Sequence, residues 1–534
     1  MTQRDTFLQF GIALIIFALL SLFIKVPGYM DAEYYTLSAA QISSGKGLTQ
    51  PILWNYLDEP AGLPHPSHTY WMPAPSLVAA AGMLLSGKTD FASGRIPFLF
   101  FAALMAPASG WMGYRFSKRR SVAWLAAGLA VFCGYYAPYT ATVDSFFLVM
   151  AGAWLFFFSI DYIYQRSIRT YILPWLLLGA ASGWMHLNRA DGLLWLALAI
   201  GVWLFLVAIP KQGKLYTRHW VCLLVIFGGY FAVTAFWYIH NLTEFSSLFP
   251  PHSGRALWMT AYNELFSYPP EQLTFTRWFA TGFKAILDDR MAALDHNNLV
   301  LSAVQGMIFL LPLWILALWK RRKDFLIRCA LGMEITILLV MSFIFPYSGM
   351  RGGFLHSSAA LQPLLWGLAA AGAMDAIQWA GSKRKWNIQA AEKVLLPGIV
   401  LISGLVSAFI FQMVVIGSNP NAPAWEESSR SAEAVRDLLQ QYQLPATTRI
   451  LINNPAGYSL ITGAEALVIP DGSPASTLAV AEKFQANILV LEMNHVAGLD
   501  TLYKNPQGNP DFQLFDSKDD IKLFKVLRKT GGAE

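Results

Sequence analysis

Residues 8–49 of this chain read LQFGIALIIFALLSLFIKVPGYMDAEYYTLSAAQISSGKGLT. Residues 8–24 carry no charged side chain, and a helix needs about 20 apolar residues to cross the hydrocarbon core of a bilayer. The stretch therefore predicts a membrane span over 7–26. Two acids, Asp31 and Glu33, follow where the chain leaves the apolar run. An acid beside an apolar wall tends to have a raised pKa, which is the condition that a general base at neutral pH requires.

Apolar runs recur along most of the chain. Of its 534 residues, 55% are hydrophobic and 13% are charged, whereas an average soluble domain carries about 25% charged residues. This composition favours an α-helical polytopic membrane protein with about 11 transmembrane helices. The predicted spans cover 7–26, 95–116, 121–140, 144–160, 171–187, 192–210, 220–239, 299–318, 325–346, 358–379 and 395–416.

Lysine and arginine gather in short clusters between these runs. If the first span runs outward from the cytoplasm, every cluster lies on one side of the membrane, as the positive-inside rule requires. We therefore expect a multi-pass protein of the cell (cytoplasmic) membrane with a cytoplasmic N-terminus. Such clusters are a topology signal, and we expect no nucleic acid among the partners. The clusters are Arg4, SKRR at 117–120, QRSIR at 165–169, KQGKLYTR at 211–218, KRRKD at 320–324 and SKRKW at 382–386.

This topology places two long loops, 28–94 and 240–298, on the outer face of the membrane. Residues 73–87 in the first loop are apolar but too short for a span, and counting them as one would invert every later junction. They are predicted to form a helix along the membrane surface. In the second loop, YPPEQLTFTRWFATGFKAIL at 268–287 favours another surface helix.

The composition changes after the last span, which divides the chain into a membrane domain, 1–416, and a soluble unit, 424–534. Strand-like runs TRILINN, ALVIP and NILVLE alternate with helical runs, and FQLFDSKDDIKLFKVLR predicts a closing hairpin. This alternation predicts a small extracytoplasmic α/β domain. The unit carries no phosphate-binding glycine motif, which favours a structural or acceptor-docking role.

Asp31 is the strongest candidate for a reactive group. On a helix, residues two apart diverge by about 200°, so the carboxylates of Asp31 and Glu33 cannot aim at one point. We expect Asp31 to be the catalytic base and Glu33 to support it.

Further charged groups stand at the outer ends of later spans. Charges at such positions are costly and are mostly functional. Arginine is the natural partner of a phosphate, by its charge and by its fork of donors. We therefore predict a phosphorylated lipid whose phosphate is bound by Arg351 and Arg189. Asp144, Asp191 and His356 are the predicted supporting residues of this site.

The first outer loop adds aromatic and histidine side chains. Tyr34 and Trp71 could pack against a sugar ring or anchor the protein at the membrane interface. His65 and His68 are the candidates for a metal pair, but HPSH is a proline-containing loop segment with no third ligand nearby in the sequence. We expect these four residues to bind or support substrate. No cofactor is predicted, and a divalent metal is left open.

Four motifs follow one another along the chain, at 31–49, 68–97, 141–156 and 187–199. In this order they resemble the GT-C superfamily of polytopic membrane glycosyltransferases. The resemblance is to the branch of aminoarabinose transferases and protein O-mannosyltransferases that depend on polyprenyl-phosphate sugars. Ala32 interrupts the family's usual D-E pair, and no WWD motif is present, which argues against oligosaccharyltransferase activity. The motifs are DAEYYTLSAAQISSGKGLT at 31–49, similar to D-E-x-x-Y…A…G-x-G; HTYWMPAPSLVAAAGMLLSGKTDFASGRIP at 68–97, similar to H-P-P-L…G…R-x-P; and ATVDSFFLVMAGAWLF at 141–156 and LNRADGLLWLALA at 187–199, which look like span starts.

The resemblance implies a cell-envelope glycosyltransferase of hexosyl or pentosyl type. The donor would be a polyprenyl-phosphate sugar, and the acceptor hydroxyl would belong to a lipid, glycan or protein on the outer face. Asp31 would be the base of an inverting single displacement. Membrane lipids are the remaining expected partners. The alternative is a non-catalytic carrier or flippase-like protein for lipid-linked saccharides. The position of most charged residues at the ends of spans argues against a carrier, whereas Glu334, in the middle of a span, favours one.

Overall fold

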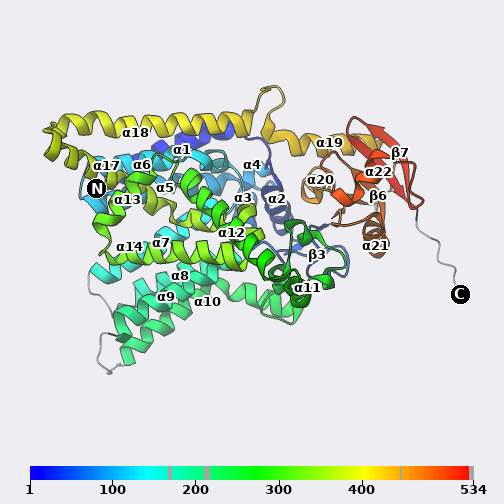
Figure 1. The fold of residues 1–534 in the computed structure, drawn as a ribbon, viewed down its shortest axis with the longest axis horizontal. Helices are drawn as coiled ribbons and strands as arrows, with labels where there is room; N and C mark the ends of the chain where they lie inside the picture. The colour runs from blue at the N-terminus through cyan, green and yellow to red at the C-terminus, as the bar shows by residue number, and fades with distance from the viewer. Residues whose placement is uncertain (166–170, 210–216, 446–447, 528–534) are drawn as a thin grey trace.

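The computed structural model describes residues 1–165, 171–209, 217–445 and 448–527. A long bundle of helices forms the membrane domain, and a small α/β unit stands at one end of it (Figure 1). The helices of the bundle are α1 Gln3–Leu20, α5 Ile96–Ser117, α6 Arg120–Val131, α7 Phe146–Gln165, α8 Ile172–Asn188, α9 Leu193–Trp203, α10 Thr217–Phe245, α13 Leu311–Arg321, α14 Phe325–Leu339, α16 Phe354–Ser358, α17 Gln362–Arg384 and α18 Ile388–Phe411.

All eleven predicted spans coincide with helical segments. By length and composition, eight described helices could cross a membrane, and a ninth if α6 and the 3-10 turn Gly134–Ala141, bent by 64°, form one span. Of the remaining two predictions, 171–187 is α8, with 17 residues. The other, 299–318, is the π-helical turn Val300–Gln305 followed by α13. A π-helical turn or a bend interrupts the regular α-helix, so the regular helix is shorter than the apolar run that predicted it.

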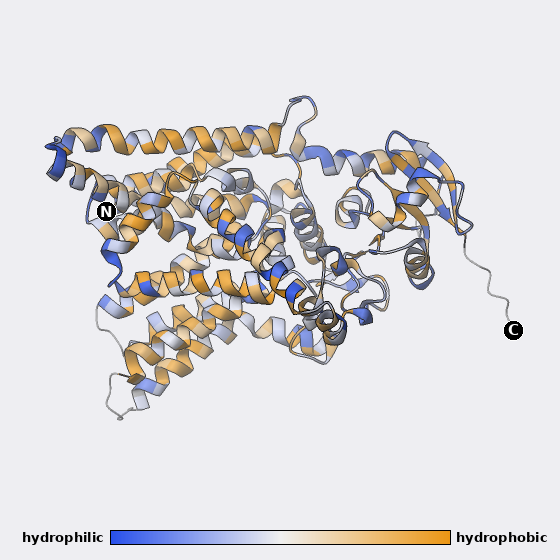
Figure 2. Ribbon diagram, in the orientation of Figure 1, coloured by the Kyte–Doolittle hydropathy of each residue, from blue (hydrophilic) through white to orange (hydrophobic). Residues whose placement is uncertain are grey.

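The basic clusters within the described residues lie together at one end of the bundle. Arg120 pairs with Asp5 at 2.6 Å, and Arg115 reaches Asp324 at 3.1 Å. Polar residues mark this end in Figure 2, far from the α/β unit. The charge pattern predicts this grouping, because positive loops share one side of a membrane. The predicted clusters 165–169 and 211–218 fall mostly outside the described residues.

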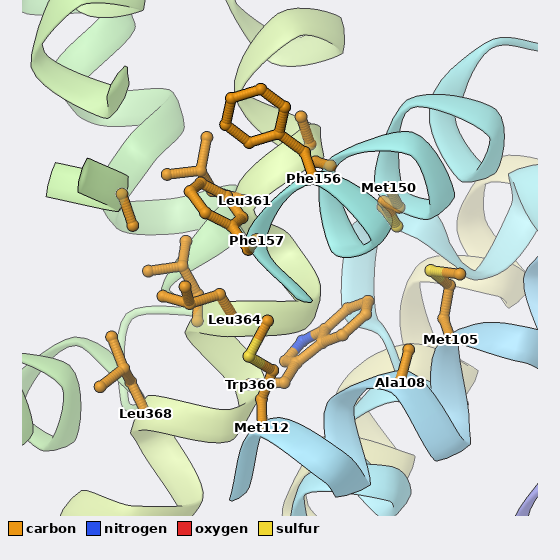
Figure 3. Packing of buried hydrophobic residues seen from close by; sticks show 14 of the residues in the cluster. Met105, Ala108, Met112, Met150, Phe156, Phe157, Leu361, Leu364, Trp366 and Leu368 are labelled. Carbon is orange, nitrogen blue, oxygen red and sulfur yellow. The ribbon is translucent and has the colours of Figure 1, made fainter. Parts of the chain in front are cut away.

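In the centre of the bundle, small residues on one helix pack against bulky residues on its neighbour. A Cβ on Gly367 of α17 would lie 2.6 Å from the Cβ of Met112 on α5, so the two helices approach closely only because this residue is glycine. Around this contact, aromatic and aliphatic side chains of α5, α7 and α17 interlock (Figure 3), among them Phe156, Phe157 and Trp366. The core thus fixes the ends of the helices that carry the candidate site.

The first outer loop folds into short elements against the ends of the bundle. Helix α2 follows the first span directly, and α3, 13 residues long, is too short to cross a bilayer, as predicted for 73–87. The elements of the two outer loops are α2 Met30–Ser43, β1 Thr49–Gln50, β2 Ile52–Leu53, β3 His65–Pro66, α3 Ala74–Ser86, α4 Phe91–Gly94, α11 Phe275–Ala280 and α12 Phe283–Leu299.

The α/β unit contains a six-stranded sheet with the order β2-β5-β4-β6-β8-β7. Its predicted strands and closing hairpin are present, and the first four strands of this order run parallel. Strand β2 was not predicted in this sheet, because it comes from the first outer loop and has only two residues. The other elements are α19 Glu427–Gln440, β4 Arg449–Ile452, α20 Pro455–Thr462, β5 Ala466–Val468, α21 Pro474–Phe484, β6 Ala486–Leu491, α22 Asp500–Lys504, β7 Phe512–Lys518 and β8 Ile521–Val526.

Candidate active site

Asp31 lies in the first turn of α2, where the chain turns away from the first span. Its half-buried carboxyl is within electrostatic reach of His356, Asp144 and Arg189. Burial raises the pKa of Asp31 to about 6, the carboxylate of Asp144 adds to the rise, and His356 and Arg189 oppose it. Four residues that are distant in the sequence therefore act on one another here. The carboxyl is poised to gain and lose a proton near neutral pH.

Asp144 and His356 form the next layer of the site. The Nδ1 atom of His356 lies 3.3 Å from a carboxylate oxygen of Asp144 and 3.1 Å from the hydroxyl of Ser145. The imidazole stacks on Phe146, with ring centroids 4.0 Å apart. Burial alone would raise the pKa of Asp144, but His356 and the hydroxyl of Tyr29, which donates to the carboxylate, lower it below its usual value. Asp144 is thus held as an anion beside His356.

Arg189 ends α8 and is fixed by three protein groups. Its Nε donates to the hydroxyl of Ser357 at 2.8 Å and to Asp191 at 3.0 Å, and an Nη atom donates to the carbonyl of Gly353 at 3.2 Å. The guanidinium therefore lies at the junction of α8 with α16, which also carries His356. It is a fixed cation beside Asp31.

Arg351 lies in the π-helical turn Gly349–Gly353, where the backbone departs from helical geometry. The side chain is exposed, and its guanidinium carbon is 5.2 Å from the centre of the Tyr262 ring, within cation–π range. Burial raises the pKa of Tyr262; the charge of Asp31 adds to this rise, and the charge of Arg351 opposes it. The second outer loop thus supplies an aromatic ring that contacts the exposed arginine and lies within electrostatic reach of the candidate base.

Aromatic side chains line the same region of the first outer loop. The ring of Trp71 is 3.9 Å from Trp54 and 4.6 Å from Tyr34, measured between centroids. Tyr35 and Tyr70 contact these rings. Burial raises the pKa of both tyrosines, and the charges of Asp31 and Arg189 also act on it. Tyr34 and Trp71 therefore belong to a wall of rings that adjoins Asp31.

Three predicted site residues face other partners. His65 is paired with Asp58 at 2.7 Å. His68 is fully buried between the hydroxyls of Ser67 and Ser76, and burial lowers its pKa to about 3. Both rings thus bond to side chains of the first outer loop, and His65 also lines a small pocket with Tyr34 and Trp71. Glu33 points away from Asp31 toward the α/β unit, in agreement with the 200° separation of the two residues on a helix.

Solved structures of two membrane enzymes share this fold. The archaeal oligosaccharyltransferase AglB from Archaeoglobus fulgidus, in complex with an inhibitory peptide and a dolichol-phosphate, aligns with a TM-score of 0.56 at 13% identity over 92% of this chain and 70% of its own. ArnT from Cupriavidus metallidurans aligns over 97% of both chains in the apo state (TM-score 0.54, 10% identity) and over 100% of both when bound to undecaprenyl phosphate (0.51, 12%). The chain has the GT-C fold. No protein-family model and no curated protein matches the sequence.

The GT-C fold accounts for a site built from so many separate segments. Asp31 follows the first span, Asp144 precedes α7, Arg189 ends α8, and His356 and Arg351 lie in the broken helix before α17. All five positions are ends or breaks of helices. Helix α2, which carries Asp31, lies at the end of the bundle nearest the α/β unit (Figure 1). Three of the four motifs quoted from the sequence mark segments of this site, those of Asp31, Asp144 and Arg189. The order of motifs therefore predicts the GT-C fold although each one alone is weak.

The described residues do not fit a metal site. Among them, no group of three or more histidine, cysteine, aspartate or glutamate side chains is arranged to hold a metal ion. Asp31 and Asp144 instead face His356 and the guanidinium of Arg189. We therefore derive no catalytic step through a metal.

The sequence did not single out two tyrosines of the site. Tyr29 donates its hydroxyl to Asp144, and Tyr262 carries Arg351 over its ring. Tyr29 directly precedes α2 and could have been found from its position beside Asp31. Tyr262 lies in the second outer loop, more than 200 residues from Asp31, and no pattern in the sequence links it to either charge.

Proposed function

We propose that this protein is a membrane glycosyltransferase that moves a sugar from a polyprenyl-phosphate donor to an acceptor hydroxyl on the outer face of the cell membrane. The observation that carries the proposal is the carboxyl of Asp31, with its raised pKa, beside the fixed guanidinium of Arg189. The proposal is supported by the place of α2, which carries Asp31, at the end of the bundle opposite the N-terminus (Figure 1). Two solved structures with this fold contain a dolichol-phosphate or undecaprenyl phosphate, which supports a lipid phosphate as the ligand.

In the proposed reaction, Asp31 accepts the proton of the acceptor hydroxyl while that oxygen forms a bond to the anomeric carbon of the sugar. The bond between this carbon and the phosphate oxygen breaks, and the polyprenyl phosphate leaves with the bonding electrons. A single displacement of this kind inverts the anomeric centre. The leaving group is already an anion, so its departure needs cations nearby and no protonating acid.

Both arginines would bind the phosphate of the donor. Arg189 is held rigidly by Ser357 and Gly353, so it can stabilise developing negative charge without rearranging. Arg351 is exposed and can turn its fork of donors toward a ligand. The aromatic wall of Tyr34 and Trp71 offers flat apolar faces for a sugar ring.

The direct test is transfer by the purified protein in vesicles, with a panel of polyprenyl-phosphate sugars as donors. Release of polyprenyl phosphate together with a glycosylated acceptor would support the transferase. Movement of the intact lipid-linked sugar between leaflets, with no cleavage from any donor, would instead support the carrier. Mass spectrometry of lipids and surface glycans from cells with and without the gene would identify the sugar and the acceptor.

The activity is expected to depend on the protonation of Asp31. Its pKa is raised to about 6, so the carboxylate that acts as base is lost as the pH falls through 6. The groups that face Asp31 are His356, Asp144 and Arg189. We expect kcat/KM to be level above about pH 7 and to fall about tenfold for each unit below pH 6, measured between pH 4.5 and 8. A level profile down to pH 4.5 would exclude a base with a raised pKa.

A further inference from the structure

The α/β unit holds the helix that carries Asp31 through a buried carboxylate. Glu33 of α2 is 1% exposed, and it accepts hydrogen bonds from the hydroxyl of Ser428 on α19 at 2.7 Å and from the amide of Asn454 at 2.6 Å. The amide of Asn454 also donates to Ser428 at 2.8 Å, and its oxygen caps α20 through the amide of Gly457. A buried carboxylate is costly unless its oxygens are satisfied. Here both oxygens find partners on the α/β unit.

A second contact lies on the other side of Asp31. The indole of Trp425, at the start of the α/β unit, donates to the carbonyl of Val26 at 3.0 Å. A Cβ on Gly28 would lie 2.2 Å from this indole, and the backbone of Gly28 has a φ of +92°, so the contact requires glycine. Trp425 also packs edge-on against Tyr29, whose hydroxyl donates to Asp144. The α/β unit therefore contacts the chain on both sides of the candidate base in the sequence, at residues 26–29 and at Glu33.

We infer that the α/β unit positions the catalytic carboxyl, with Glu33 as a positioning residue that acts through α2. This inference rests on the proposed function of Asp31. Burial and hydrogen bonding fix the rotation of α2, and rotation of a helix moves all its side chains together. A displacement of about 1 Å at a reacting group can lower a rate by about 100-fold. The contacts of Ser428, Asn454 and Trp425 thus connect the soluble unit to the candidate base.

The test compares Glu33→Ala, Glu33→Gln and the double variant Ser428→Ala/Asn454→Ala. We expect Glu33→Ala and the double variant to lower kcat by about 10- to 100-fold with KM changed by less than about threefold. Glu33→Gln, whose amide oxygen can still accept from Asn454 while its NH2 group donates to the hydroxyl oxygen of Ser428, is expected to keep most of the activity. The matched control is Ser431→Ala, one turn further along α19, because Ser431 bonds Glu492 within the α/β unit.

Hydrogen exchange of the α2 amides, residues 30–43, provides a measurement that does not depend on the reaction. Exchange should rise at least about tenfold in Glu33→Ala and in the double variant, and stay unchanged in Ser431→Ala. Unchanged exchange would overturn the positioning role even if Asp31 is the base. If exchange rises in these variants but the wild type shows no transferase activity, the contact between α2 and the α/β unit stands and the proposed function is rejected. Activity lost equally in Glu33→Gln and Glu33→Ala would make Glu33 itself the reacting acid.

A separate cavity lies between α6 and α18, at the end of the bundle that carries the basic clusters. Its volume is about 700 Å³. Both helices begin at this end, and a Cβ on Gly128 would lie 2.9 Å from Val400, so the helices close together deeper in the bundle. The lining changes from polar to apolar along the helices: Ser121, Glu392 and Lys393 at the open end, then Leu125, Leu396 and Val400.

The charges around this cavity favour an anionic ligand. Glu392 is neutralised by Arg119 at 3.1 Å, and Asp5 by Arg120 at 2.6 Å. Lys393 is exposed at the same rim, which leaves three cations against two carboxylates. We propose that the cavity binds an anionic glycerophospholipid, with its phosphate beside Lys393 and an acyl chain along the apolar lining. A membrane lipid has the same order of polar and apolar parts as the cavity wall.

Native mass spectrometry of the purified full chain, with phosphatidylglycerol and phosphatidylcholine added in equal amounts, tests this site. The wild type is expected to retain phosphatidylglycerol at least about tenfold more strongly, and Lys393→Glu to lose this preference. Lys383→Glu, an exposed lysine on α17 outside the cavity, is the control and should behave as wild type. Leu396→Trp should reduce binding of both lipids by filling the cavity. Equal retention of the two lipids by the wild type would reject the proposal.

Discussion

Replacing Asp31 with asparagine is expected to lower kcat by about 100- to 10,000-fold and at the same time to stabilise the protein. The loss follows because asparagine cannot accept the proton of the acceptor hydroxyl, and general bases contribute rates of this order. The gain follows from the pKa of Asp31, which rises from 3.8 to about 6 in the folded protein. The folded state binds this proton more tightly than the unfolded state, so ionisation at pH 7 opposes folding by about 1–3 kcal/mol.

The two effects can be measured on one preparation, by donor turnover and by the apparent melting temperature in the same detergent. The stabilisation of Asp31→Asn relative to wild type should be present at pH 7.5 and disappear below about pH 4, where both states hold the proton. Asp288→Asn is the control, because Asp288 is exposed and pairs with Lys284 on the surface. Full transfer by Asp31→Asn would refute the proposed mechanism, whereas lost transfer without stabilisation would show that the carboxyl is not strained by burial.

The sequence predicts the membrane domain well because apolar runs and basic clusters are local signals. The segments 95–116 and 325–346 lie within a residue or two of α5 and of α14 with its π turn. Interruptions of regular helix are harder to predict. The bend after α6 and the π turn that carries Arg351 depend on packing against other segments, which a hydropathy pattern does not contain.

The candidate site was predicted residue by residue, but its connections were not. Charged groups at span ends are costly, which singles out Asp31, Asp144, Arg189 and His356 in the sequence. The fold brings these four within electrostatic reach of one another. Residue type alone points to His65 and His68, and the structure pairs them with Asp58 and with two serines of the same loop. The pairing of β2 with β5 joins residues more than 400 positions apart, and strands of two or three residues carry no register signal for such a contact.

Replacing Arg351 with alanine is expected to lower kcat/KM by about 100- to 1,000-fold, the loss typical when one hydrogen-bond donor to a developing anion is removed. Arg351→Lys should recover only part of this, since lysine keeps the charge but not the fork of donors that matches a phosphate. Arg322→Ala is the matched control: Arg322 is also exposed, and its guanidinium carbon lies 5.0 Å from the centre of the Trp319 ring, at the other end of the bundle.

Inhibition by the product, polyprenyl phosphate, separates binding of the phosphate from other effects of Arg351. If Arg351 holds the phosphate, the inhibition constant should rise at least about tenfold in Arg351→Ala and remain at the wild-type value in Arg322→Ala. An unchanged constant, with kcat/KM still lowered, would assign Arg351 to the acceptor rather than the donor. Full activity of Arg351→Ala would leave Arg189 as the phosphate ligand, because Ser357, Asp191 and Gly353 already hold it beside Asp31.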